Sequence, residues 1–157
     1  MINEYVVLDL EMTGLSAKTD QIIEIGAVKI KDNQVVDTMS CLVNPRCKIP
    51  TRVSELTGIT DEMVADAPDE DQALTDFFAF CGDCNLLVAH NASFDMGFLR
   101  ATMNRCKIKR KLSVIDTLIM ARALYPQLKK HRLDTLAAHQ GVAQRNHHRA
   151  DDDARVL

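Results

Sequence analysis

Short runs of apolar, β-prone residues recur along this chain and are separated by polar turns. Residues 5–11 are mostly apolar, a pattern that predicts a strand buried on both faces. Two further strands are predicted at 21–30 and 34–43. The short Asp32-Asn33 connection between them favours a hairpin, so the sheet is expected to begin antiparallel. Shorter apolar runs predict a fourth and a fifth strand, at residues 85–90 and 114–116.

Helical spacing of apolar residues marks several segments between and after these strands. Residues 68–81 are expected to form a helix whose apolar face contains Leu74, Phe77 and Cys81. Its first turn is acidic, which suits the helix dipole. We interpret its phenylalanines as core residues rather than as a platform for stacking bases. Further helices are predicted over residues 91–105, 117–124, 132–140 and 149–157, and the complete order predicts a mixed α/β domain.

The length of 157 residues favours a single domain whose hydrophobic core is large enough to fold without disulfides or a structural metal. No apolar run approaches the roughly 20 residues of a membrane span. Residues 1–4 lack the basic and apolar regions of a signal peptide, so we expect a cytoplasmic protein without a membrane partner. Cys81 and Cys84 form a Cys-x-x-Cys pair. We interpret them as buried or unreactive thiols rather than as a zinc or redox site.

Positive charge is concentrated in three runs, at residues 105–111, 129–132 and 145–149, although the net charge is −3. Each run alone is consistent with a solvated surface or with a footprint for phosphates. An acidic metal centre that handles a polyanion needs positive charge at its rim. The three runs together therefore favour a phosphate-containing substrate.

Two carboxylates, Asp9 and Glu11, interrupt the first predicted strand near its carboxyl end. Residues two apart share a face of a strand, so we expect these side chains to lie side by side. Two ionised carboxylates at that distance repel each other unless a proton or a cation lies between them. Hard oxygen ligands suit Mg²⁺ or Mn²⁺. The alternative is a strand that ends at Leu8, with both acids solvated.

Two later segments carry further candidate groups. Asp95 follows the fourth predicted strand by a few residues, and ligand sites in α/β sheets gather at the carboxyl ends of strands. His148 stands just before the last predicted helix, with Asp153 one turn inside it. His147 and Asp152 have the same spacing. We favour Asp153 because it shares a helix face with two apolar residues that should turn toward the sheet, Val156 and Leu157.

Four motifs, in this order, are similar to the DEDDh family of 3′→5′ exonucleases. They are Asp9-x-Glu11 with Thr13-Gly14-Leu15, residues 22–28, residues 90–95, and His148-Arg149-Ala150-x-x-Asp153-Ala154. The resemblance extends from Tyr5 to the last residue. It implies a ribonuclease-H-like fold: a mixed five-stranded sheet, three antiparallel strands and then parallel ones, flanked by helices. Residues 88–99 most resemble the proofreading exonuclease domain of PolC-type DNA polymerase III, and next the stand-alone epsilon proofreading subunit.

Two features depart from the family pattern. Threonine is usual where Met12 stands, and residues 10–14 also resemble oligoribonuclease, although the second motif does not. The family's last helix normally continues beyond the position of Leu157. We therefore expect one 3′→5′ exonuclease domain over residues 1–157 whose final helix is truncated at the C-terminus.

The resemblance also implies the chemistry. Four carboxylates would hold two divalent ions, Mg²⁺ or Mn²⁺, and one histidine would take a proton from the attacking water; in this chain they are Asp9, Glu11, Asp95, Asp153 and His148. The family pattern selects His148 over His147 because Arg149-Ala150 should follow the histidine. Hydrolysis of the last phosphodiester would release a nucleoside 5′-monophosphate.

By the same resemblance, substrate-binding residues surround the terminal nucleotide: Met12, Thr13, Gly14, Leu15, Asn91 and Phe94. The residues alone leave plainer roles open, as turn and cap residues for Gly14 and Asn91 and as core for Leu15 and Phe94. The implied substrate is a single-stranded or frayed 3′ end of DNA, read with weak sequence preference. The implied partner is the polymerase subunit or domain of DNA polymerase III.

Two alternatives to this function stay open. The first is a stand-alone exonuclease that acts on RNA or on both nucleic acids. The second is a nucleic-acid-binding module without catalysis, which the presence of all four acids and a suitable histidine disfavours.

Overall fold

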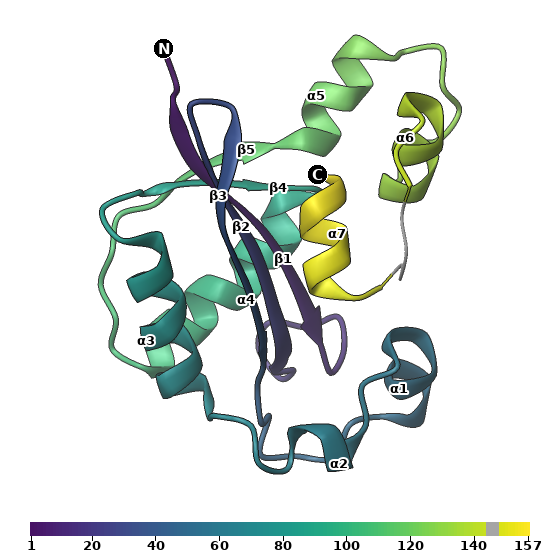
Figure 1. The fold of residues 1–157 in the computed structure, drawn as a ribbon. Helices are drawn as coiled ribbons and strands as arrows, with labels where there is room; N and C mark the ends of the chain where they lie inside the picture. Colours follow the sequence, from purple (N-terminus) through teal and green to yellow (C-terminus); the bar gives the residue numbers. More distant parts are fainter. Residues whose placement is uncertain (144–147) are drawn as a thin grey trace.

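A five-stranded mixed sheet organises the fold (Figure 1). The computed structural model describes residues 1–143 and 148–157, without the side chains of residues 151 and 152. The strands are β1 (Glu4–Met12), β2 (Ile22–Lys31), β3 (Gln34–Leu42), β4 (Leu86–Ala89) and β5 (Ser113–Asp116). Their order is β3-β2-β1-β4-β5; the first three strands pair antiparallel, and β4 and β5 run parallel to β1. This arrangement confirms the predicted mixed sheet.

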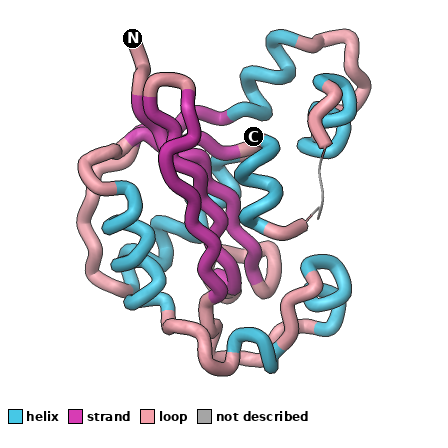
Figure 2. The backbone as a smooth tube through the Cα atoms, viewed as in Figure 1, coloured by secondary structure: helices cyan, strands magenta, loops and turns pink. Residues whose placement is uncertain are grey.

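Seven helices surround the sheet in the described part of the chain (Figure 2). They are α1 (Thr51–Thr57), α2 (Asp61–Val64), α3 (Glu70–Cys81), α4 (Ala92–Arg105), α5 (Thr117–Leu124), α6 (Leu133–Gln140) and α7 (Ala150–Val156). The longer helices lie where the apolar spacing predicts them. No helix among the described residues has the length and apolar character needed to cross a bilayer.

The two faces of the sheet are covered by different helices. Even-numbered residues of β1, such as Leu8 and Leu10, belong to the main core together with Phe77 of α3 and Leu99 of α4. Odd-numbered residues such as Val7 pack instead against α7. Figure 1 shows α7 on the face opposite α3 and α4. Because side chains alternate along a strand, the odd-numbered Asp9 and Glu11 are directed to the α7 side.

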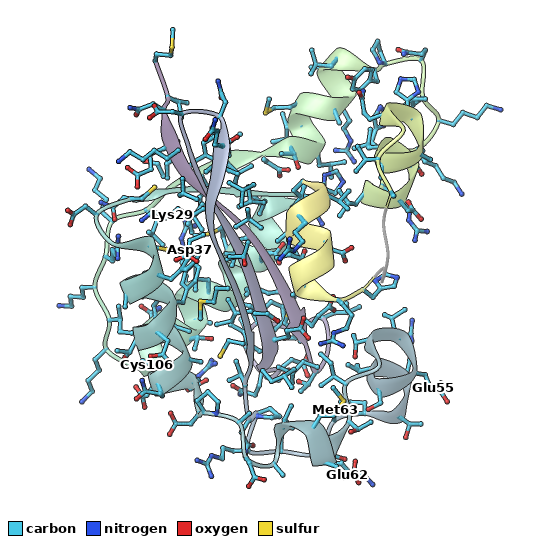
Figure 3. All side chains as sticks on the ribbon, viewed as in Figure 1. Lys29, Asp37, Glu55, Glu62, Met63 and Cys106 are labelled. Carbon is cyan, nitrogen blue, oxygen red and sulfur yellow. The ribbon has the colours of Figure 1, made fainter. Side chains whose placement is uncertain are left out.

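Polar contacts fasten α3 to the sheet on the other face. The Nζ of Lys29 on β2 donates to the carbonyl oxygens of Phe80 and Cys81, at 3.5 and 3.3 Å, where α3 ends (Figure 3). A cation at this position also suits the negative end of the helix dipole. Cys81 and Cys84 nearby are buried free thiols.

One carboxylate at the end of β5 positions the starts of two helices. Asp116 accepts hydrogen bonds from the backbone N–H groups of Asn91 and Ala92, both at 3.0 Å, and from that of Leu118 at 2.9 Å. The first two N–H groups begin α4 and the third begins α5. A helix start otherwise has N–H groups without partners, so Asp116 fixes the place of α4, the helix that carries Asp95.

Candidate active site

Three carboxylates converge at the carboxyl end of β1. One oxygen each of Asp9, Glu11 and Asp153 lies within 4.8 Å of the others. The first two come from one strand, and the third comes from α7 across the same face of the sheet. The alternative in which the strand ends at Leu8 is wrong, because β1 continues to Met12 and stays paired with β2.

Asp95 approaches this cluster from the first turn of α4. Its Oδ1 accepts a hydrogen bond from the backbone N–H of Leu10 at 3.1 Å, which ties the start of the helix to β1 between the other two acids. The side chain is buried, and removal from water raises its pKa to about 7. The four acids predicted for the site thus come together from β1, α4 and α7.

The cluster is electrostatically unfavourable as long as every carboxylate is ionised. Removal from water, followed by the charges of Asp153 and Glu24, raises the pKa of Glu11 to about 9. Removal from water and the charge of Asp95 raise the pKa of Asp9 well above its ordinary value. Protons or a cation must therefore compensate the charge. A set of hard oxygen donors with this need fits Mg²⁺ or Mn²⁺.

Glu24 connects α7 to the sheet, and sequence reasoning missed its role. It lies on β2 opposite Glu11 and is fully buried. Its Oε1 accepts from the backbone N–H of Ala150, and its Oε2 accepts from Nε of Arg149, both at 2.9 Å. The sequence did carry a signal for this role, since Glu24 stands within an otherwise apolar strand. A buried carboxylate there requires hydrogen-bond or ion-pair partners from elsewhere in the fold.

His148 stands at the junction of the cluster and the surrounding cavities. Its backbone N–H donates to Oδ2 of Asp153 at 3.1 Å, a contact that turns the segment back on α7. Its φ of 65° lies in the left-handed region, which permits this reversal. The alternative base His147 lies outside the described residues, as does the side chain of Asp152.

A cavity of about 500 Å³ adjoins the acids and is lined mainly by apolar residues. We call it the apolar pocket; its walls are residues 10–15, Pro50, Arg52, Val53, Leu56, Thr57, Phe94 and His148. Leu15 is 82% exposed at this wall, so the alternative that places it in the core is wrong. Phe94 packs on the core, edge-to-face with Phe98 at 5.4 Å, and also lines the pocket.

The loop that follows β1 is closed by Asp20. This carboxylate accepts from the backbone N–H of Ser16 at 2.9 Å and from the hydroxyl of Thr13 at 3.3 Å. A Cβ atom on Gly14 would lie 2.5 Å from Oδ2 of Asp20. This close approach favours glycine at position 14, where it lines the apolar pocket.

A family model described as "Exonuclease", named RNase T, matches residues 6–157 of the chain. The chain belongs to the exonuclease family. This match covers nearly the whole sequence and confirms the family that the four motifs predict.

The exonuclease domain is also similar to segments of much longer proteins. It is 49% identical over 154 residues to the DNA polymerase III PolC-type of Clostridium perfringens (strain 13 / Type A). That match covers 98% of this chain and 11% of the relative. The chain spans about a tenth of the length of the curated relatives that it matches.

Solved structures of exonucleases have the same fold. Exonuclease X in complex with 5′ overhanging duplex DNA is 29% identical, with a TM-score of 0.75 over 97% of this chain and 85% of that one. The nuclease domain of 3′hExo, a DEDDh family member bound to rAMP, is 18% identical, with a TM-score of 0.85 over 98% and 87%. These likenesses confirm the predicted ribonuclease-H-like fold.

The structure separates Asn91 from the other predicted substrate residues of the exonuclease domain. Met12, Thr13, Gly14 and Leu15 line the apolar pocket, whereas Asn91 lines a different cavity, which shares His148 with the pocket. Asn91 occupies the N-cap position of α4 in a left-handed conformation, and its side chain makes no capping hydrogen bond.

Proposed function

We propose that this exonuclease domain removes nucleoside 5′-monophosphates from DNA 3′ ends in a metal-dependent reaction, as a proofreading activity in DNA replication. The observation that carries the proposal is the convergence of Asp9, Glu11 and Asp153 beside the apolar pocket. Glu11 belongs to both. A pocket of about 500 Å³ with apolar walls is large enough for one nucleotide's base and sugar.

The four acids would hold two divalent ions, Mg²⁺ or Mn²⁺. Asp9, Glu11 and Asp153 supply converging oxygens, and Asp95 supplies a buried carboxylate next to them. Ions bound there would stabilise negative charge on the oxygen of the attacking water and on the 3′ oxygen that leaves. The raised pKa values of Asp9 and Glu11 support this assignment, because metal binding would displace the protons that these groups otherwise retain.

The protein groups around the acids would position the substrate and move one proton. His148, at the edge of both cavities, would accept a proton from the attacking water, because histidine is the side chain that most often serves as a general base. The backbone of Met12 and Thr13 would line the terminal nucleotide's site. Leu15 would press against the last base, and Phe94, which also lines the apolar pocket, would help to shape the site.

DNA is the proposed substrate, and a longer polymerase is the proposed context. The relatives are named as PolC-type DNA polymerase III, and the structural neighbour Exonuclease X was solved with duplex DNA. Residues 1–157 would then form a single domain of a cytoplasmic replicative polymerase, with a last helix that continues beyond Leu157. Adding the native downstream sequence should tighten metal binding and raise the melting temperature; unchanged values would count against this boundary.

Comparing three substrates tests the function. The chain is incubated with Mn²⁺ and end-labelled single-stranded DNA, single-stranded RNA of the same sequence, and duplex DNA with a mismatched 3′ terminus. We expect mononucleotides from all DNA substrates that expose a free 3′ end. Faster hydrolysis of RNA would replace the DNA assignment, and release of no mononucleotide would leave a binding module without catalysis.

A further inference from the structure

A second cavity, of about 540 Å³, also has His148 in its wall. Four basic side chains line it: Arg122 at the end of α5, Lys129 and Lys130 in the α5–α6 loop, and Arg132 just before α6. We call it the basic cleft. Asn91 forms part of its wall, and none of the acidic side chains that the structure describes lines it. His148 is shared with the apolar pocket, so the two cavities meet at this residue.

Within the described part of the chain, the positive charge of the basic cleft is largely uncompensated. Among the described residues, Arg122, Lys129 and Lys130 make no ion pair. Arg132 makes one with Asp134 at 3.5 Å, and both of these side chains are well exposed. Exposed pairs of this kind are weak, so Arg132 can exchange its partner for another anion at little cost.

Hydrogen bonds hold the loop that carries the two lysines. Nε2 of His90, at the end of β4, donates to the carbonyl oxygen of His131 at 2.8 Å. Nε2 of His131 in turn donates to the carbonyl oxygen of Tyr125 at 2.8 Å. The other ring nitrogen of His90 lies 3.0 Å from the hydroxyl of Thr117. The basic side chains therefore project from a loop anchored to the same strand end that leads into α4 and Asp95.

The two cavities differ in the part of a nucleic acid strand that they suit. A 3′-terminal nucleotide has one base and one sugar beyond the scissile phosphate, which suits apolar walls. The strand on the other side adds one negative charge with every nucleotide, which suits a row of cations. We propose that the basic cleft binds the phosphates on the 5′ side of the scissile bond, while the apolar pocket holds the terminal nucleotide. This assignment rests on the proposed function.

The basic run at residues 105–111 has a different role and supplies the control. Arg105 is paired with Glu70 at 2.9 Å, and Arg110 donates to the carbonyl oxygens of Phe78 and Cys84. Lys109 and Lys111 are exposed and line a cavity that shares no residue with the basic cleft or the apolar pocket. Lys109→Ala/Lys111→Ala thus removes the same charge as Lys129→Ala/Lys130→Ala, away from the site.

Binding and hydrolysis are measured on the full chain and both double variants. Binding of 5′-fluorescein-labelled dT12 to metal-free protein is followed by anisotropy between 50 and 200 mM salt. Lys129→Ala/Lys130→Ala should weaken binding about tenfold at low salt and lower the slope of log K against log salt by about 1.4. With Mn²⁺, its KM for dT12 should rise similarly, while kcat/KM for the dinucleotide dT2 stays unchanged. The control variant should match the parent in every measurement.

Three results would overturn the assignment: equal binding of dT12 by all three proteins, equal weakening in both double variants, or a loss with dT2 as large as with dT12. If the parent hydrolyses neither substrate, the proposed function is wrong, and the anisotropy measurement still decides whether these lysines bind the strand.

Discussion

Replacing Glu24 tests how the sheet holds α7 and, with it, two catalytic candidates. Glu24→Ala leaves the N–H of Ala150 and the guanidinium of Arg149 without their buried acceptor. Removing one partner of a buried ion pair costs about 3–5 kcal/mol. Glu24 also raises the pKa of Glu11 through its charge, so the variant relieves some repulsion. We expect a net loss of about 2–4 kcal/mol in the free energy of unfolding.

The same substitution should impair catalysis more than binding. His148 and Asp153 flank the contacts that Glu24 makes, and a misplacement of about 1 Å can cost about 10²-fold in rate. We therefore expect kcat on single-stranded DNA to fall by about that factor, with KM nearly unchanged. Glu24→Gln retains the size and one acceptor oxygen, so it should recover part of both losses.

Urea denaturation and steady-state hydrolysis measure the two effects. The matched control is Glu4→Ala, which removes a partly exposed acid that lies 3.5 Å from Lys29 at the other end of the same strand pair. That variant should lose no more than about 1 kcal/mol and keep its kcat. If Glu24→Ala were as stable and as active as Glu4→Ala, the role assigned to Glu24 would be refuted.

Three further predictions concern the acids and the base. Asp9→Ala should abolish hydrolysis but leave the melting temperature equal or higher, because it relieves repulsion among the acids; near-parental rates in Mg²⁺ would contradict this. His148→Gln should lower kcat by about 10²–10⁴-fold, whereas His147→Gln should stay within a few-fold of the parent; the reverse order would exchange the two roles. In chelator, the free energy of unfolding should fall as pH rises from about 4.5 to about 9, because the folded chain keeps a proton on Glu11 that the unfolded chain releases. The free energy of unfolding is measured by urea titration at each pH. If it stayed constant or rose over that range, the raised pKa of Glu11 in the folded chain would be contradicted.

Local sequence patterns predicted most of the fold. The period of two along β1 placed Asp9 and Glu11 on one face, and the turn at Asp32-Asn33 gave the antiparallel start of the sheet. The boundaries of α5, whose first turn is capped by the adjacent Asp116, also followed from local signals. These features depend on neighbours within a few residues, so a sequence carries them directly.

Contacts between distant residues could not be predicted in this way. Glu24 and Arg149 are 125 positions apart, and only the fold brings them together. The carboxylate of Asp116 likewise binds N–H groups 24 and 25 positions earlier. The three basic runs looked alike in the sequence, yet Arg110 satisfies backbone carbonyls while Lys129 and Lys130 line a cleft at His148.

The direction and product of hydrolysis test the central claim most directly. A single-stranded 12-mer carries a fluorophore at its 5′ end and a radiolabelled nucleotide at its 3′ end, and the first turnover is followed in Mg²⁺. The account predicts that the 3′ label is released first, as a nucleoside 5′-monophosphate, and that Asp9→Ala releases none. Release of the 5′ label first, internal fragments, or equal products from Asp9→Ala would contradict it.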